Sequence, residues 1–146
     1  LAEVLDVPFI ELDRWVEREA GMTLGEIFEL RGEAHYRRIE RETLEQALRK
    51  PGQVVIAAGG SIVTAADTWR RLQEGARTVW LKASPASHLE RVLAQGDLRP
   101  MQGRPNAAKE LEVILSERSR LYAQADLHLD TDGLGVRGVV SALAHD

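Results

Sequence analysis

The chain has no cysteine and no long apolar run. The lack of cysteine excludes disulfide bonds, thiolate metal ligands and a cysteine nucleophile. A membrane-spanning helix needs about 20 consecutive apolar residues, and no segment offers them. The N-terminus also lacks the basic-then-apolar pattern of a signal segment. Together these absences favour a cytoplasmic protein that makes no membrane contact.

The chain also has fewer basic than acidic residues. A net charge of −4 argues against a broad basic face for nucleic acid, so DNA contact would require a domain outside this chain. The histidines are not spaced at i, i+4 and have no acidic cluster beside them, which makes a histidine metal site improbable. A chain of 146 residues with 44% hydrophobic and 29% charged residues is typical of one globular domain over 1–146.

Apolar runs of strand length alternate with helical patterns along the chain. Strands are expected at about residues 7–12, 54–58, 78–81 and 127–130, and the runs at 54–58 and 78–81 are typical of buried parallel strands. Helices are expected at about 14–20, 24–30, 33–49, 65–74, 85–94, 107–123 and 135–144. This alternation predicts an α/β fold with a parallel sheet.

Two segments stand apart from this pattern. Residues 95–106 carry two glycines and two prolines, and we interpret them as a movable, lid-like loop. Residues 1–5 look like the end of a helix without a cap of its own, which leads us to expect an N-terminally truncated chain.

Acidic side chains follow the first expected strand. Glu11 and Asp13 lie at its carboxyl end, where ligands bind in open α/β sheets. The alternative is a solvated turn at a helix N-terminus, where carboxylates are favoured in any case.

Adjacent arginines occur within Tyr36-Arg37-Arg38-Ile39-Glu40. They point about 100° apart on a helix, so one can face inward while the other stays solvated. Arginine suits bidentate recognition of a carboxylate. Alternatively both are solvated, with Arg38 paired to Glu42 at i+4.

Three further motifs follow in order along the chain. Gly59-Gly60-Ser61 comes after the strand at 54–58, and glycine there lets the backbone approach a ligand. Arg99-Pro100-Met101 lies in the lid-like loop, and Arg118-Ser119-Arg120-Leu121-Tyr122 ends the helix at 107–123. Gly-Gly is also common in plain turns.

Together these motifs resemble shikimate kinase, a small P-loop kinase with a three-layer parallel sheet that phosphorylates a hydroxyl of a cyclic carboxylic acid. The resemblance extends over nearly the whole chain. It implies that Asp13 orients the acceptor hydroxyl and acts as a catalytic base. It also implies that Arg37 and Arg118 bind the carboxylate, with Gly59 and Gly60 beside the substrate.

The chain departs from the family pattern at several of these positions. Glu11 replaces the usual aspartate near Mg²⁺, which it would reach through water. Ser61 replaces a third glycine, and its hydroxyl would either block the site or contact a different ligand. Arg120 replaces a proline, and Met101 follows Arg-Pro where kinases usually have leucine.

The ATP side of the resemblance is incomplete, because neither G-K-S nor G-K-T occurs in the sequence. The resemblance implies that the first strand and the phosphate loop are missing from this chain, which alone should not transfer phosphate. ATP and Mg²⁺ would be cofactors only if the natural protein has that loop. Arg99 would then be a catalytic, nucleotide-binding residue that closes over the phosphates.

The departures leave more than one function open, and it is uncertain whether the protein is an enzyme. The chain also resembles the shikimate-kinase-like C-terminal domain of helix-turn-helix transcriptional regulators of aromatic degradation. We favour that interpretation, in which the domain senses an aromatic acyl-CoA such as benzoyl-CoA. The alternative is a shikimate kinase acting on the 3-hydroxyl of shikimate, and a weaker one is a related kinase such as gluconate kinase. A homodimer is compatible with any of them.

Overall fold

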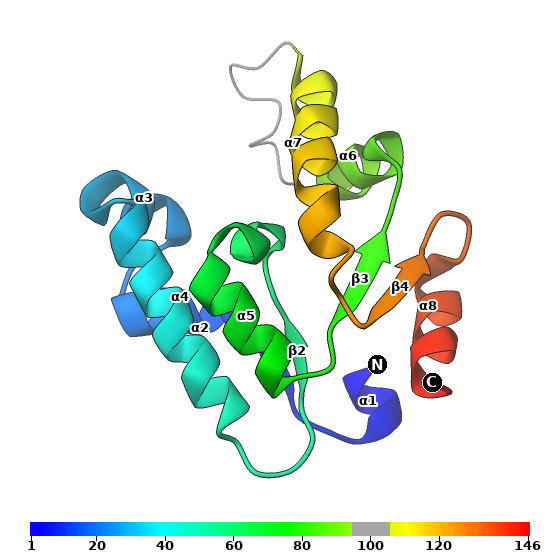
Figure 1. The fold of residues 1–146 in the computed structure, drawn as a ribbon, viewed down its shortest axis with the longest axis horizontal. Coiled ribbons are helices and arrows are strands. Elements are labelled where there is room, and N and C mark those ends of the chain that lie inside the picture. The colour runs from blue at the N-terminus through cyan, green and yellow to red at the C-terminus, as the bar shows by residue number, and fades with distance from the viewer. Residues whose placement is uncertain (95–105) are drawn as a thin grey trace. The chain divides into compact units, whose positions relative to one another are not determined.

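The computed structural model describes residues 1–94 and 106–146, and Figure 1 shows their helices and strands. They group into two compact units, one of residues 1–76 with 143–146 and one of residues 77–142. Both contain parallel strands with helices beside them, so the predicted α/β class is confirmed. That 1–146 is a single domain stays a prediction.

The first unit holds a pair of strands and most of the helices. Its elements are α1 (Ala2–Leu5), β1 (Phe9–Glu11), α2 (Leu12–Ala20), α3 (Leu24–Arg31), α4 (Glu33–Leu48), β2 (Val55–Ala57), the 3-10 helix η1 (Gly60–Thr64) and α5 (Ala66–Gly75). β1 and β2 are parallel, with Phe9 opposite Val55 and Glu11 opposite Ala57. Their carboxyl ends therefore lie side by side.

Local signals set the helix boundaries of this unit. α2 ends at Gly21, whose φ of 68° lies in the left-handed region that favours glycine. The Thr23 side chain caps α3 by accepting a hydrogen bond from the Glu26 N–H at 3.2 Å. Both boundaries agree with the sequence prediction.

The core of the first unit joins α2, α3 and α4. Val16, Ile27, Tyr36 and Ile39 form a buried cluster. Because these side chains come from three successive helices, their burial fixes the direction of α4 against α2 and α3.

The second unit contains β3 (Val79–Lys82), α6 (Pro85–Ala94), α7 (Ala107–Tyr122), β4 (Leu127–Asp130) and α8, whose full range is Gly135–Ala144. β3 and β4 are parallel. At one end of this pair, Asp126 accepts hydrogen bonds from the backbone N–H and the hydroxyl of Thr78. At the other end, the Thr131 hydroxyl donates to the Lys82 carbonyl. The two strands are thus joined by side chains at both ends.

Three details of the sequence prediction were wrong. The first strand stops at Glu11, because Leu12 begins α2 and is fully buried there. η1 was not predicted, since a short 3-10 turn has no long apolar period to reveal it. The runs at 54–58 and 78–81 are not buried strands. In the described residues each pairs with one neighbouring strand, and β3 is largely exposed.

Among the described residues, no helix is long and apolar enough to cross a membrane.

We predict that Ile27→Ala lowers the free energy of unfolding by about 2–5 kcal/mol, because it leaves a cavity in the cluster shared by three helices. Leu30→Ala on the same helix is the matched control. Leu30 is 68% exposed, so its loss should change stability by less than about 0.5 kcal/mol. Urea unfolding followed by circular dichroism compares them, and equal losses would contradict the packing described here.

The Thr78 hydrogen bonds hold the pKa of Asp126 below its usual value of 3.8. A carboxylate with a lowered pKa stabilises the folded state above about pH 3.8, and this contribution is lost as the pH falls through the lower folded value. Asp126→Asn should therefore flatten the fall in stability below pH 3.8. Thermal unfolding measured from pH 2 to 6 checks this, and parallel curves for the two proteins would contradict it.

Candidate functional site

The first unit brings Asp13 and Gly59 together. The parallel register sets Glu11 opposite Ala57, and the chain continues from these residues into α2 and into the Gly59-Gly60 turn. A Cβ atom on Gly59 would lie 3.5 Å from both carboxylate oxygens of Asp13. The Gly59 backbone thus lies directly against this carboxylate, at the carboxyl ends of two parallel strands, where α/β folds bind ligands.

Arg37 is held by a buried acid on its own helix. The Glu40 side chain is 1% exposed, and its Oε1 accepts a hydrogen bond from Arg37 Nη1 at 2.8 Å. A buried carboxylate is tolerated when it is paired with a cation and hydrogen-bonded. The Arg37 side chain is itself only 19% exposed, so the inward role predicted for Arg37 agrees with its position.

Tyr36 provides the second contact to this acid. Its hydroxyl donates to Glu40 Oε2 at 3.0 Å, and its ring packs against Phe28 with the centroids 4.6 Å apart. Burial, and then the negative charges of Glu40 and Asp13, raise the pKa of Tyr36 well above its ordinary value. The hydroxyl therefore remains protonated and continues to act as a donor.

A third contact joins Arg37 to η1. Arg37 Nη2 donates to Thr64 Oγ1 at 3.3 Å, and that hydroxyl donates to the Ser61 carbonyl at 2.7 Å. The guanidinium thus connects α4 to the segment that begins at Gly60. Asp13, Arg37 and the 59–64 segment accordingly belong to one connected region of the first unit.

The remaining predicted site residues are placed as follows. The Glu11 side chain is 57% exposed, so its carboxylate is accessible. Its Oε2 lies 4.0 Å from Arg14 Nε. Ser61 is half-buried in η1, beside Gly60. Arg118 is half-buried on α7 in the second unit, and its convergence with Arg37 stays a prediction. Arg99 and all of the lid-like loop at 95–106 except Asn106 lie outside the described residues.

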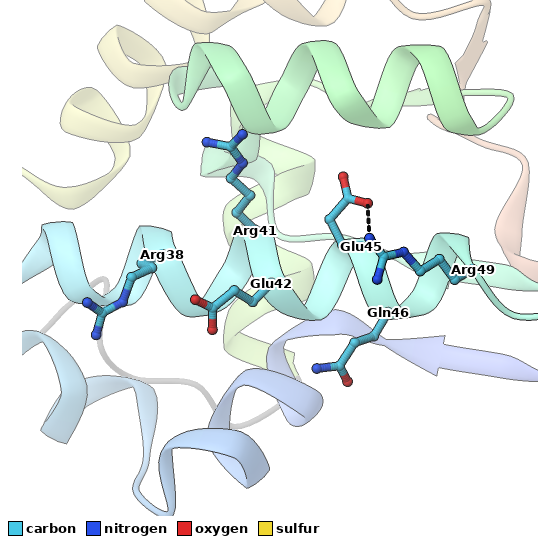
Figure 2. Close-up of a pocket in the computed structure, with 6 residues that line it drawn as sticks. All are labelled: Arg38, Arg41, Glu42, Glu45, Gln46 and Arg49. Carbon is cyan, nitrogen blue, oxygen red and sulfur yellow. Dashed lines mark ion pairs between the residues drawn. The ribbon is translucent and has the colours of Figure 1, made fainter.

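The outer face of α4 carries charged side chains of both signs (Figure 2). They line a shallow hollow and are Arg38, Arg41, Glu42, Glu45, Gln46 and Arg49. Arg38 is exposed and contacts His35 at 2.9 Å rather than forming the pair with Glu42 that the sequence allowed. Arg37 is largely buried and Arg38 is exposed, which is the first of the two arrangements that the helical spacing allowed.

Comparison with known proteins identifies the family. The family model described as shikimate kinase matches residues 1–145. The chain belongs to the shikimate kinase family. It is 39% identical to a shikimate kinase of Synechococcus sp. (strain CC9902) over 87% of its own length and 65% of that protein's. It is 38% identical to a shikimate kinase of Gloeobacter violaceus over 92% of its length and 75% of that protein's.

Solved structures of the family agree with this assignment. The shikimate kinase from Acinetobacter baumannii in complex with shikimate matches with a TM-score of 0.88 and 27% identity, over 99% of this chain and 80% of that one. The shikimate kinase from Bacteroides thetaiotaomicron matches with a TM-score of 0.83 and 29% identity, over 99% of this chain and 83% of that one. The P-loop kinase type of fold is thereby confirmed.

The favoured regulator interpretation was wrong. The relatives reported above, at 38–39% identity, are named shikimate kinases, and the similar structures are of shikimate kinases as well. The departures at Ser61, Met101 and Arg120 were given too much weight. Single substitutions beside a site are poor indicators of a new ligand when the surrounding sequence remains that of the family.

Sequence reasoning missed how Arg37 is held. Glu40 follows it at i+3, a spacing at which side chains on a helix meet, and this spacing was visible in the sequence. The burial of Glu40 was not visible, because glutamate is rarely fully buried and only packing reveals it. Thr64, 27 residues away from Arg37, had no sequence signal.

We predict that Arg37→Ala destabilises the fold by about 3–5 kcal/mol, because it leaves the buried Glu40 carboxylate without its cation. Arg38→Ala removes an identical but exposed side chain from the next position and should change stability by less than about 0.5 kcal/mol. Chemical denaturation of both variants is the measurement. A loss for Arg37→Ala no greater than that for Arg38→Ala would show that Glu40 does not depend on this pairing.

Proposed function

We propose that the protein containing this chain is a shikimate kinase that transfers a phosphoryl group from ATP to the 3-hydroxyl of shikimate. The observation that carries the proposal is the arrangement around Arg37. The buried Glu40 holds the guanidinium of Arg37, which also donates a hydrogen bond to Thr64. Thr64 ends the 59–64 segment, and Gly59 at the start of that segment lies against Asp13. Family membership supports the same reaction. Because the chain spans 65% of the Synechococcus relative, the activity is proposed for the full-length protein.

Different residues of the first unit bind the carboxylate, the hydroxyl and the ring of shikimate in this proposal. Arg37 binds the carboxylate of shikimate through guanidinium N–H groups, in the planar geometry that arginine offers to carboxylates. Asp13 orients the acceptor hydroxyl by accepting a hydrogen bond from it, and its carboxylate is the group that would take up the hydroxyl proton. Gly59 places no side chain against the Asp13 carboxylate, and by resemblance Gly59 and Gly60 lie beside the substrate. Arg118 is proposed as the second carboxylate ligand.

The chain offers one of the carboxylates that a Mg²⁺ site for phosphoryl transfer would use. Mg²⁺ at phosphoryl-transfer sites is held by one or two carboxylates, waters and the phosphates, where it neutralises developing charge. The accessible carboxylate of Glu11, at the end of β1, suits a contact through water. The described residues contain no cluster of three or more potential metal ligands, so the phosphates and waters would complete the coordination.

This chain lacks the sequence motif that would hold the phosphates of ATP. Its sequence has no G-K-S or G-K-T, and so it offers no phosphate loop of the kind that cradles a nucleotide. Arg99 remains a proposed nucleotide-binding residue by resemblance alone, and the cytoplasmic location and the homodimer remain predictions.

The test is shikimate-dependent ADP formation by the full-length protein with Mg·ATP. Asp13→Asn should lower kcat by about 10²–10⁴-fold, the usual contribution of a positioned acid or base, and should change KM less. Asp67→Asn is the control, because Asp67 is an exposed acid that pairs with Arg70 on α5.

Turnover by the wild type and by Asp67→Asn, but not by Asp13→Asn, would support the proposal. Turnover of gluconate in place of shikimate would point to a related kinase. Absence of turnover with either acid, or full activity of Asp13→Asn, would overturn the assigned roles.

A further inference from the structure

We propose that the Tyr36 hydroxyl is a positioning group for substrate binding, which acts by orienting Glu40 so that Glu40 holds Arg37 ready for a substrate carboxylate. This inference rests on the proposed function. It concerns a residue that would not touch substrate and whose effect is transmitted through two hydrogen bonds.

The ring of Tyr36 and its hydroxyl have separate roles. The ring belongs to the buried cluster with Val16, Ile27 and Ile39, and it packs against Phe28. A phenylalanine ring could fill the same volume and make the same apolar contacts. The hydroxyl is a polar group whose burial is unfavourable unless it is hydrogen-bonded, and its partner is Glu40. The reason for a hydroxyl at this position therefore lies in Glu40 and not in the core.

The two oxygens of Glu40 are divided between two donors. Tyr36 donates to Oε2 and Arg37 donates to Oε1. A carboxylate fixed at one oxygen by a neutral donor cannot readily turn to offer both oxygens to the guanidinium. Without the hydroxyl, Oε2 would need another donor, and the guanidinium fork of Arg37 already donates to the other oxygen of the same carboxylate. Bidentate pairing with Glu40 would occupy N–H groups that a ligand carboxylate needs.

The opposite side of Arg37 is already restrained. Nη2 donates to Thr64, and Nε lies 3.8 Å from Glu33, which is 71% exposed. Arg37 Nη1 also donates to Glu40, and the three contacts together set the plane of the guanidinium. The contact from Glu33 is weak because that acid is solvated. The Tyr36–Glu40 bond is therefore the buried restraint that decides how Arg37 faces the site.

The donor is also constant with pH. Burial and the nearby charges of Glu40 and Asp13 raise the pKa of Tyr36, so the hydroxyl does not ionise in the range where the enzyme would work. Tyr36 thus differs from a histidine or lysine donor, because it supplies a hydrogen bond to Glu40 without adding a second positive charge.

The experiment compares Tyr36→Phe with the wild type in the full-length protein. We expect KM and the calorimetric Kd for shikimate to rise about tenfold, equivalent to about 1.4 kcal/mol. We expect kcat and the KM for ATP to change less than about twofold, the pattern for lost ground-state binding. Thr43→Val is the control. It removes another buried hydroxyl from α4, one that donates to the Ile39 and Glu40 carbonyls, and it should leave the KM for shikimate unchanged.

A second measurement separates positioning from a loss of stability. The methyl ester of shikimate lacks the charged carboxylate, so wild type and Tyr36→Phe should bind it equally. If Tyr36 works through Glu40, adding Tyr36→Phe to Glu40→Gln should change Kd for shikimate no further, because residues that act in series are not additive. If Tyr36→Phe proves partly unfolded, the ratio of its Kd for the acid to its Kd for the ester still decides the matter, because a smaller folded fraction weakens both ligands equally.

The outcomes are distinct. Wild type that neither binds nor phosphorylates shikimate would overturn the proposed function and this inference with it. Wild type that binds shikimate, with Tyr36→Phe equal to it or weakened equally for acid and ester, would overturn only the inference. Selective weakening for the acid, absent from Thr43→Val and from the Glu40→Gln background, would support it.

Discussion

The ion pair between Glu40 and Arg37 is the interaction on which the candidate site depends. A glutamate with no exposure is unfavourable in a protein interior unless its charge is matched, so Glu40 requires both the guanidinium of Arg37 and the hydroxyl of Tyr36. The same requirement fixes Arg37, whose long side chain would otherwise sample many rotamers. Under the proposed function, stability and binding are linked at one carboxylate, because the group that needs a cation for its burial also orients Arg37, the proposed carboxylate ligand.

The geometry around this pair follows from ordinary packing. α4 must direct Tyr36 and Ile39 into the cluster with α2 and α3, and the helical period then brings Arg37 and Glu40 to the edge of that cluster. The parallel pairing of β1 with β2 independently brings Asp13 beside Gly59. The Arg37–Thr64 bond joins the two arrangements, because Thr64 ends the 3-10 turn that begins at Gly60. The site is thus assembled from a helix, a strand end and a glycine turn.

The regulator interpretation is contradicted by the similar proteins, which are named shikimate kinases. It rested partly on Ser61 and Arg120, two single departures from the family pattern. The pair proposed here for recognition of an acid, Arg37 and the Glu40 that holds it, is present in the chain.

The sequence by itself determined the α/β class, most helix boundaries and the separation of Arg37 and Arg38 to different directions on their helix. Each follows from a local rule: apolar period, the Thr23 cap, glycine at the end of α2, and the turn of a helix between adjacent residues. Only the tertiary structure decided that Glu40 is buried, that Thr64 reaches Arg37 and that Gly59 lies against Asp13. Burial and contacts between residues far apart in the chain depend on which faces pack together, and no local pattern of residues encodes that choice.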